Sequence, residues 1–128
     1  MIAIQAPLHI ALNVSDRAQA EAFYGGVLRL TPAPRPLSFP GCWYQVGDFQ
    51  LHLIVAEGWR SVPPAPEKWG RNAHLAFAVE DLEAAKTALI NAGCPIQASA
   101  SGRAALFTQD PDGNIIELSQ AVNPTQIM

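Results

Sequence analysis

Three histidines and one glutamate are the residues of this sequence best suited to chemistry, and an internal repeat relates their positions. His9 matches His74 and His52 matches Glu117, because 74 minus 9 and 117 minus 52 both equal 65. Every histidine of the chain falls in this register. A fixed offset is the mark of an internal repeat. Imidazole and carboxylate ligate divalent Zn, Ni, Co, Fe and Mn, so these four side chains are the predicted ligands of one divalent ion.

Each of the four candidates lies in a segment that alternates as a half-buried strand does. Around His9, the apolar residues Ile10, Leu12 and Val14 share one face and leave the histidine on the other. The other three candidates also oppose the bulky apolar residues of their segments. A lone strand histidine is more often a hydrogen-bonded core residue than a ligand, so a neutral polar network stays open as the alternative. Glutamate is seldom buried without a partner, which favours the metal interpretation of Glu117.

The elements needed to position these residues follow the same plan in both halves of the chain. The first half predicts a strand at 8–14, a helix that begins at the polar residues Ser15–Asp16, and a proline-rich edge or loop at 30–41. A hairpin follows, with strands at 43–46 and 49–55 joined at Gly47–Asp48. After a connection over 56–72, the second half repeats the order. It predicts a strand at 74–79, a helix from Asp81 to Gly93, a strand at 96–98, and a hairpin with strands at 104–108 and 114–118. Each half therefore predicts a β-α-β-β-β module, and two such modules are expected to combine their sheets into a cup.

Composition limits the class of protein. A chain of 128 residues with 49% hydrophobic and 15% charged residues is typical of one globular domain. The net charge of −3 and the eight scattered basic residues argue against nucleic-acid binding. The sequence shows neither a secretory leader nor an apolar run of membrane-spanning length, so we expect a cytoplasmic protein without a membrane partner. Cys42 and Cys94 form no metal-binding or redox spacing and are expected to be reduced thiols.

Four stretches resemble the vicinal oxygen chelate superfamily: HIALNVSD, FYGGVL, HLAFAVEDLEAAKTAL and DPDGNIIEL. This superfamily includes glyoxalase I, methylmalonyl-CoA epimerase, extradiol dioxygenases, fosfomycin-resistance enzymes and bleomycin-binding proteins. The resemblance implies an α+β fold in a single glyoxalase-like domain over 1–128, with modules at about 7–56 and 73–120 that form a cup-shaped mixed sheet around a metal site. The positions that match the family's ligands are His9, His52, His74 and Glu117.

The residue at position 52 bears on the reaction. Glyoxalase I usually carries a glutamate where this chain has His52, and a neutral imidazole would replace it as ligand or as catalytic base. The leading interpretation is a metal-dependent lyase or isomerase that chelates vicinal oxygens of a small oxygen-rich substrate and transfers a proton. An extradiol dioxygenase would instead hold ferrous iron with His9, His74 and Glu117. The third alternative is a non-catalytic sequestering protein of the bleomycin-resistance type.

Residues that bind substrate are expected beside the metal. Arg35 and Arg103 are candidates to grip a carboxylate or phosphate, Trp43 to line the pocket, and Asn13 to contact substrate from the face of His9. The resemblance also implies a homodimer. Whether the metal site lies within one chain or is shared between two is left open.

Overall fold

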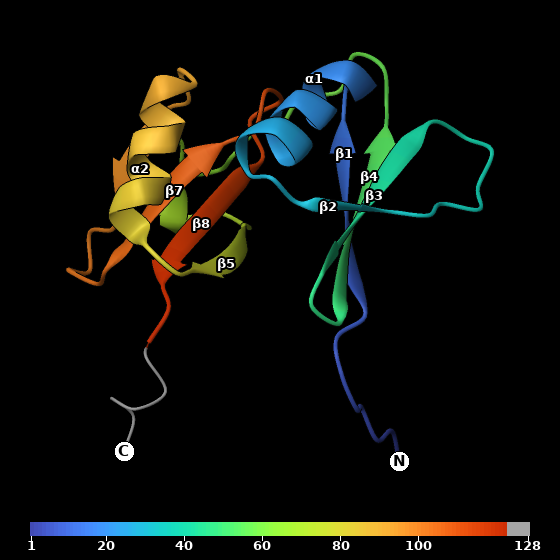
Figure 1. Ribbon diagram of the computed structural model, residues 1–128, viewed down its shortest axis with the longest axis horizontal. Helices are drawn as coiled ribbons and strands as arrows, with labels where there is room; N and C mark the ends of the chain where they lie inside the picture. The colour runs from blue at the N-terminus through green and yellow to red at the C-terminus, as the bar shows by residue number, and fades with distance from the viewer. Residues whose placement is uncertain (123–128) are drawn as a thin grey trace. The chain divides into compact units, whose positions relative to one another are not determined.

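The computed structural model describes residues 1–122, so the sequence-based expectation of an irregular end from Val122 to Met128 falls almost entirely outside the described residues. The chain forms two compact units, Met1–Arg60 and Ser61–Met128. Each unit contains one four-stranded sheet and its own helix (Figure 1). The α+β class and the repeated β-α-β-β-β module are confirmed. The joining of the two sheets into a cup stays a prediction.

The first unit places its two candidate histidines on neighbouring strands. Its elements are β1 (His9–Val14), α1 (Arg17–Glu21), the π-helix η1 (Ala22–Val27), β2 (Thr31–Ala33), β3 (Gly41–Val46) and β4 (Phe49–Val55). The strand order is β1-β4-β3-β2, with β1 parallel to β4 and the other pairs antiparallel. The proline-rich stretch thus supplies the edge strand β2, where a missing N–H donor is tolerated.

The second unit repeats this arrangement. Its elements are the 3-10 helix η2 (Trp69–Arg71), β5 (Leu75–Val79), α2 (Leu82–Asn91), β6 (Ile96–Ala98), β7 (Ala105–Gln109) and β8 (Ile115–Gln120). The strand order is β5-β8-β7-β6, again with one parallel pair, β5 and β8. The hairpin strands end within two residues of the bounds expected from the sequence.

Both helices begin at the expected aspartate. Asp16 Oδ1 accepts from the Gln19 N–H at 2.9 Å, and Asp81 Oδ1 accepts from the Ala84 N–H at 3.1 Å, which satisfies a free amide in each first turn. The two glycines of FYGGVL do not end the first helix; the turn widens instead into the π-helix η1. A side chain at Gly25 would place its Cβ 3.3 Å from Tyr44 Oη, so this glycine lets the widened turn lie close to the sheet.

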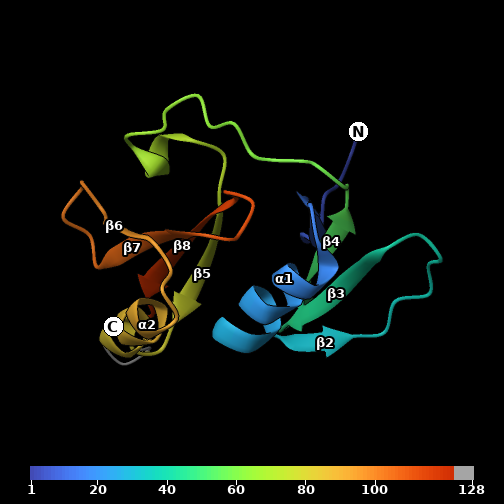
Figure 2. The ribbon, with the colours of Figure 1, turned by 90° about the horizontal axis from the view of Figure 1, so that it is seen from above.

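Each unit has its own core between the helix and the apolar face of its sheet. Tyr24, Leu51 and Leu53 are fully buried in the first unit, and Leu89 and Ile116 in the second. Figure 2 shows α2 along one face of its sheet, where it contacts β6, β7 and β8. Both cysteines are free thiols, as expected. Within residues 1–122, no helix has the length and apolar character needed to cross a membrane. Helix packing therefore occupies one sheet face in each unit, and the predicted ligands lie on the other.

Candidate functional site

The pairing register of the two sheets reproduces the sequence repeat. Ala11 on β1 lies opposite His52 on β4, and Ala76 on β5 lies opposite Glu117 on β8. His9 and His74 each precede these alanines by two residues and therefore share their faces. One candidate pair is thus brought together in each unit.

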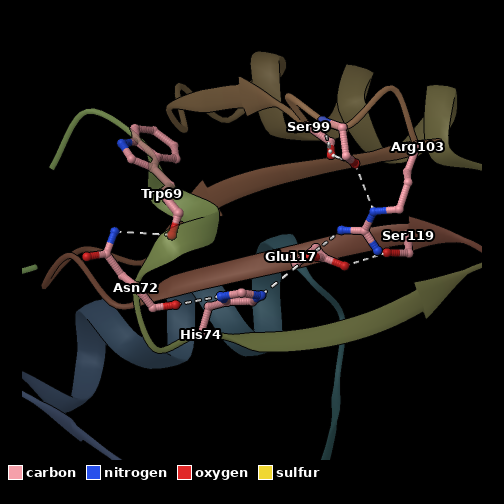
Figure 3. A network of polar contacts seen from close by, with 8 residues as sticks. Trp69, Asn72, His74, Ser99, Arg103, Glu117 and Ser119 are labelled. Carbon is pink, nitrogen blue, oxygen red and sulfur yellow. Dashed lines mark hydrogen bonds and ion pairs between the residues drawn. The ribbon is translucent and has the colours of Figure 1, made fainter. Parts of the chain in front are cut away.

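In the second unit, His74 lies directly beside Glu117 (Figure 3). His74 Nε2 is 3.3 Å from Glu117 Oε1, and His74 Nδ1 is 2.7 Å from the carbonyl oxygen of Asn72. A carbonyl only accepts hydrogen bonds, so Nδ1 carries the proton in this contact. In a neutral ring, Nε2 then turns a lone pair toward a carboxylate oxygen, and the two atoms need a cation or a second ring proton between them.

The spacing of this pair fits a metal ion. Two ligand atoms at right angles on an ion, each about 2.1 Å from it, lie about 3 Å apart. The separation of 3.3 Å between His74 Nε2 and Glu117 Oε1 is close to this value. The bond from His74 Nδ1 to a backbone carbonyl is also the contact that commonly orients metal-binding histidines.

Glu117 is buried but well supplied with donors. Ser119 Oγ donates to Oε2 at 2.7 Å, and Arg103 Nη2 donates to Oε1 at 3.4 Å. Burial by itself raises the pKa of Glu117, but the Ser119 hydrogen bond and the charges of Arg103 and His74 outweigh it. The pKa of Glu117 therefore lies below its ordinary value, so the carboxylate is charged at neutral pH.

A cavity of about 610 Å³ opens beside this pair and is lined by His74, Glu117 and Arg103. Arg103 Nε also donates to Ser101 Oγ at 3.0 Å, which holds the guanidinium against the cavity. Two further cations line it, Lys68 and Arg71. The sequence pattern predicts only a connection between the two halves for their segment, 56–72. The signal in the sequence is the close spacing of Lys68 and Arg71 at the end of this segment.

In the first unit, the candidate pair forms part of a stack of three rings. The centroids of His9 and His52 are 4.1 Å apart with planes inclined by 16°, and those of Trp43 and His52 are 3.9 Å apart with planes inclined by 5°. Trp43 lies opposite His52 in the β3–β4 ladder. Burial, His9 and Arg35 lower the pKa of His52, which favours its neutral ring.

The stack does not yet have the geometry of two ligands on one ion. A metal bound by imidazole lies in the plane of the ring, and planes inclined by 16° meet far beyond a metal–nitrogen bond. One ring must turn before both nitrogens reach the same ion. His9 is exposed and free of helix packing, so it is the ring with room to move.

The remaining expected substrate-binding residues lie in different surroundings. Arg35 lines a cavity of about 490 Å³ together with Trp43, and its guanidinium lies 4.5 Å from the centroid of the Phe39 ring. Arg35 Nη1 donates to the Leu37 carbonyl at 3.3 Å. Asn13 is exposed on β1, on the face of His9. Among the four candidates, Trp43 and Arg103 thus touch predicted ligands, whereas Arg35 lines a separate cavity.

Over residues 1–122, no three His, Cys, Asp or Glu side chains are gathered into a group able to hold a metal ion. The structure brings together His9 with His52, and His74 with Glu117, each pair within one unit. The meeting of all four side chains at one ion stays a prediction.

Comparison with known proteins identifies the family. The model of the glyoxalase-like domain matches residues 9–119. Three solved structures show the same fold. A Bacillus anthracis protein assigned to the glyoxalase family is 25% identical, with a TM-score of 0.76 over 92% of this chain and 96% of that one. A glyoxalase/dioxygenase from Nostoc punctiforme is 24% identical, with a TM-score of 0.74 over 96% of this chain and 99% of that one. The antibiotic-binding protein TnmS3 from a Streptomyces species is 22% identical, with a TM-score of 0.68 over 95% of this chain and 100% of that one.

No curated protein sequence matches the chain. The domain match covers both modules and includes all four predicted ligands, from His9 to Glu117. The motifs that resemble the vicinal oxygen chelate superfamily lie in the same range, and the fold agrees with them. The chain belongs to the glyoxalase-like domain family.

Proposed function

We propose that this protein is a metal-dependent lyase or isomerase of the glyoxalase type that acts on a small, oxygen-rich substrate. The observation that carries the proposal is the His74–Glu117 pair, in which His74 Nε2 and Glu117 Oε1 lie 3.3 Å apart with the far side of the imidazole held by a carbonyl. A divalent ion bound there, of Zn, Ni, Co, Fe or Mn, would supply a Lewis acid for vicinal substrate oxygens.

The two units would contribute equally to the ligand set. His74 and Glu117 would bind from the second unit, and His9 and His52 from the first, after His9 turns out of the ring stack. Units from one chain or from two chains of a homodimer would serve equally well. Sedimentation of the metal-loaded protein tests the dimer, which a metal-loaded monomer would exclude.

The proposed role of His52 is to accept a proton from a substrate carbon next to a carbonyl, or to act as a ligand. Its lowered pKa keeps the ring neutral and therefore able to accept a proton at neutral pH. Trp43 lies flat against the ring and restricts its orientation. Asn13 lies on the same face and would contact the substrate.

The substrate would also carry an anionic group. Arg103 lines the cavity beside Glu117 together with Lys68 and Arg71, and a guanidinium suits a carboxylate or phosphate. Arg35, in the cavity of the first unit, is a weaker candidate because its Nε and Nη2 atoms are buried, without a hydrogen-bond partner among the described residues, and so are out of reach of a ligand. Removal of Arg103 is therefore expected to weaken substrate binding more than removal of Arg35.

Two other functions have specific support. A structural neighbour is named a glyoxalase/dioxygenase, which favours ferrous iron held by His9, His74 and Glu117. Another is named an antibiotic-binding protein, and the stack of Trp43, His52 and His9 would offer a flat platform to an aromatic molecule. These alternatives predict oxygen uptake with catechols and metal-independent ligand binding, respectively.

Metal analysis by mass spectrometry tests the proposal. The untagged wild-type protein, purified without chelators, is compared with Glu117→Gln, His74→Ala and the control Glu57→Gln, which changes an exposed carboxylate. We expect about one ion per site in the wild type and the control, and at least about tenfold weaker binding in the other two. Zinc or nickel without oxygen uptake supports the lyase or isomerase, whereas iron with oxygen uptake supports the dioxygenase. Failure to bind any added ion would overturn both enzymatic proposals.

A further inference from the structure

A chain of side-chain amides runs along the β3–β4 hairpin to His52. Gln45 Nε2 donates to the carbonyl oxygens of Gly47 and Phe49, at 2.7 and 3.3 Å. Backbone carbonyls only accept hydrogen bonds, so the amide group of Gln45 must point its NH₂ at them. The Gln45 oxygen is thereby directed the other way, toward Gln50.

The direction of the next two hydrogen bonds follows from the first. Gln50 Nε2 donates to Gln45 Oε1 at 2.7 Å, which leaves Gln50 Oε1 facing His52 Nε2 at 2.8 Å. An amide oxygen has no proton to give, so His52 Nε2 must carry the hydrogen. The carbonyls of Gly47 and Phe49 therefore determine the proton position on the ring of His52, which lies five and three residues further along the chain.

We infer that Gln45 and Gln50 are positioning residues that hold His52 as the Nε2–H tautomer and so present Nδ1 as its lone-pair atom. The assignment of the tautomer is independent of any activity. The use of Nδ1 as metal ligand or proton acceptor rests on the proposed function. We call the hydrogen bonds from Gln45 through Gln50 to His52 the relay. The relay acts in the plane of the His52 ring, while Trp43 and His9 restrict that ring from its two faces.

The second unit presents the opposite nitrogen. His74 carries its proton on Nδ1, against the Asn72 carbonyl, and offers Nε2. The relay has no counterpart there, because the repeat-related position of Gln50 is the apolar Ile115 and that of His52 is Glu117. A carboxylate accepts through either oxygen, so Glu117 needs no group to set a proton position. An imidazole at the same position accepts only through the nitrogen that carries no proton. The two glutamines thus occur in the unit whose candidate ligand at this position is a histidine and not a glutamate.

The tautomers are measured by long-range ¹H–¹⁵N correlation of the imidazole rings in ¹⁵N-labelled protein, with chelator present and at about pH 8, where histidine is neutral. A His52→Gln variant identifies the resonances. We expect His52 with Nε2 protonated and His74 with Nδ1 protonated. The preference should be roughly tenfold or more, because reversal would place two acceptors face to face.

Variants separate the relay from a merely structural effect. Gln50→Leu removes the acceptor and is expected to give His52 a mixture of tautomers. Gln50→Glu loses the bond to Gln45 Oε1 but keeps an acceptor for Nε2–H, so it is expected to retain the Nε2–H form. The exposed helical change Gln19→Leu is expected to leave the tautomer unchanged. An otherwise unchanged backbone amide spectrum of residues 1–60 shows that the first unit remains folded in each variant. A wild-type His52 with Nδ1 protonated, or a tautomer unaffected by Gln50→Leu, would overturn the inference.

Metal titration then distinguishes the relay from the proposed function. With zinc or nickel as the probe, Gln50→Leu is expected to weaken binding by about tenfold, a typical effect for a group that orients a ligand, and Gln50→Glu is expected not to weaken it. Correct tautomers without any metal binding would leave the relay intact and reject the metal site. Metal binding by a protein whose His52 carries its proton on Nδ1 would support the metal site and reject the relay.

Discussion

Replacing Glu117 by glutamine tests the electrostatic account of the second unit, because the change preserves shape and removes one charge. In the metal-free protein, Ser119 donates to the carboxylate at 2.7 Å and Arg103 at 3.4 Å. A hydrogen bond to a charged group contributes about 1.5–3 kcal/mol, against about 1 for a neutral one. The Arg103 pair contributes less than about 1 kcal/mol, since that side chain is 60% exposed. Relief from burying a charge acts in the opposite direction, so we expect a net loss of about 1–2 kcal/mol at neutral pH.

The stability that the Glu117 carboxylate contributes should depend on pH. The pKa of Glu117 is lower in the folded protein than its ordinary value, because its donors outweigh burial. The ionised carboxylate therefore stabilises the fold above the ordinary carboxyl range, and this stabilisation is lost as the pH falls through the folded pKa. The difference between wild type and Glu117→Gln should accordingly be largest at neutral pH and shrink in acid.

Urea unfolding in the presence of chelator measures this difference. With a slope of about 2 kcal/mol per molar urea, the midpoint of Glu117→Gln should fall by roughly 0.5–1 M at neutral pH. The control Glu57→Gln removes an exposed charge and should not shift it. Equal midpoints of wild type and Glu117→Gln at neutral pH would refute the reasoning, as would a gap that persists undiminished in acid.

Two further predictions concern the first unit. A Cβ at Gly41 would overlap the Leu53 carbonyl oxygen in the neighbouring strand and lie 2.9 Å from Arg35 Nη2, so Gly41→Ala should lower the free energy of unfolding by about 2–3 kcal/mol in a urea titration, whereas Gly26→Ala, with nothing within 4 Å, should not. An unaffected Gly41→Ala would show that the strands separate more easily than the structure indicates. In an NMR titration, the pKa of His52 should lie below its ordinary value and rise in His9→Ala; the stability due to neutral His52 should be present above the unfolded pKa and lost as the pH falls through the folded one. A His52 pKa unchanged by His9→Ala would exclude the charge of His9 as a cause.

The sequence predicted the fold well because its local patterns agree with one another. Asp16 and Asp81 mark both helix starts, and the short strand at Ile96–Ala98 was predicted with its observed bounds. The start of β3 was placed two residues too late, because its first residue is a glycine, a poor strand former in sequence. Gly41 is required there by the close approach of the Leu53 carbonyl, a tertiary contact that no local pattern reveals.

The candidate site was less predictable, because its geometry depends on side-chain rotation. Period-two alternation placed the histidines and Glu117 on the less apolar faces, and the ladders agree with it. Alternation fixes a face but not the orientation of a ring on it. The stack of His9 on His52 and the turn of Gln50 toward His52 arise from contacts around the ring.

An aromatic residue beside each candidate pair escaped the repeat for a different reason. Trp43 lies opposite His52, nine positions before it, whereas Phe107 lies opposite Glu117, ten positions before it. The second hairpin turn is longer, so the offset of 65 relates β1 to β5 and β4 to β8 but fails between β3 and β7, the first strand of each hairpin. Aligned by ladder position, Trp43 corresponds to Phe107, whose ring meets His74 edge-on at 5.4 Å. Each unit therefore places an aromatic ring from the first strand of its hairpin against a candidate histidine. Sequence comparison within this chain recovers that relation only when the two hairpins are aligned by their strand pairing.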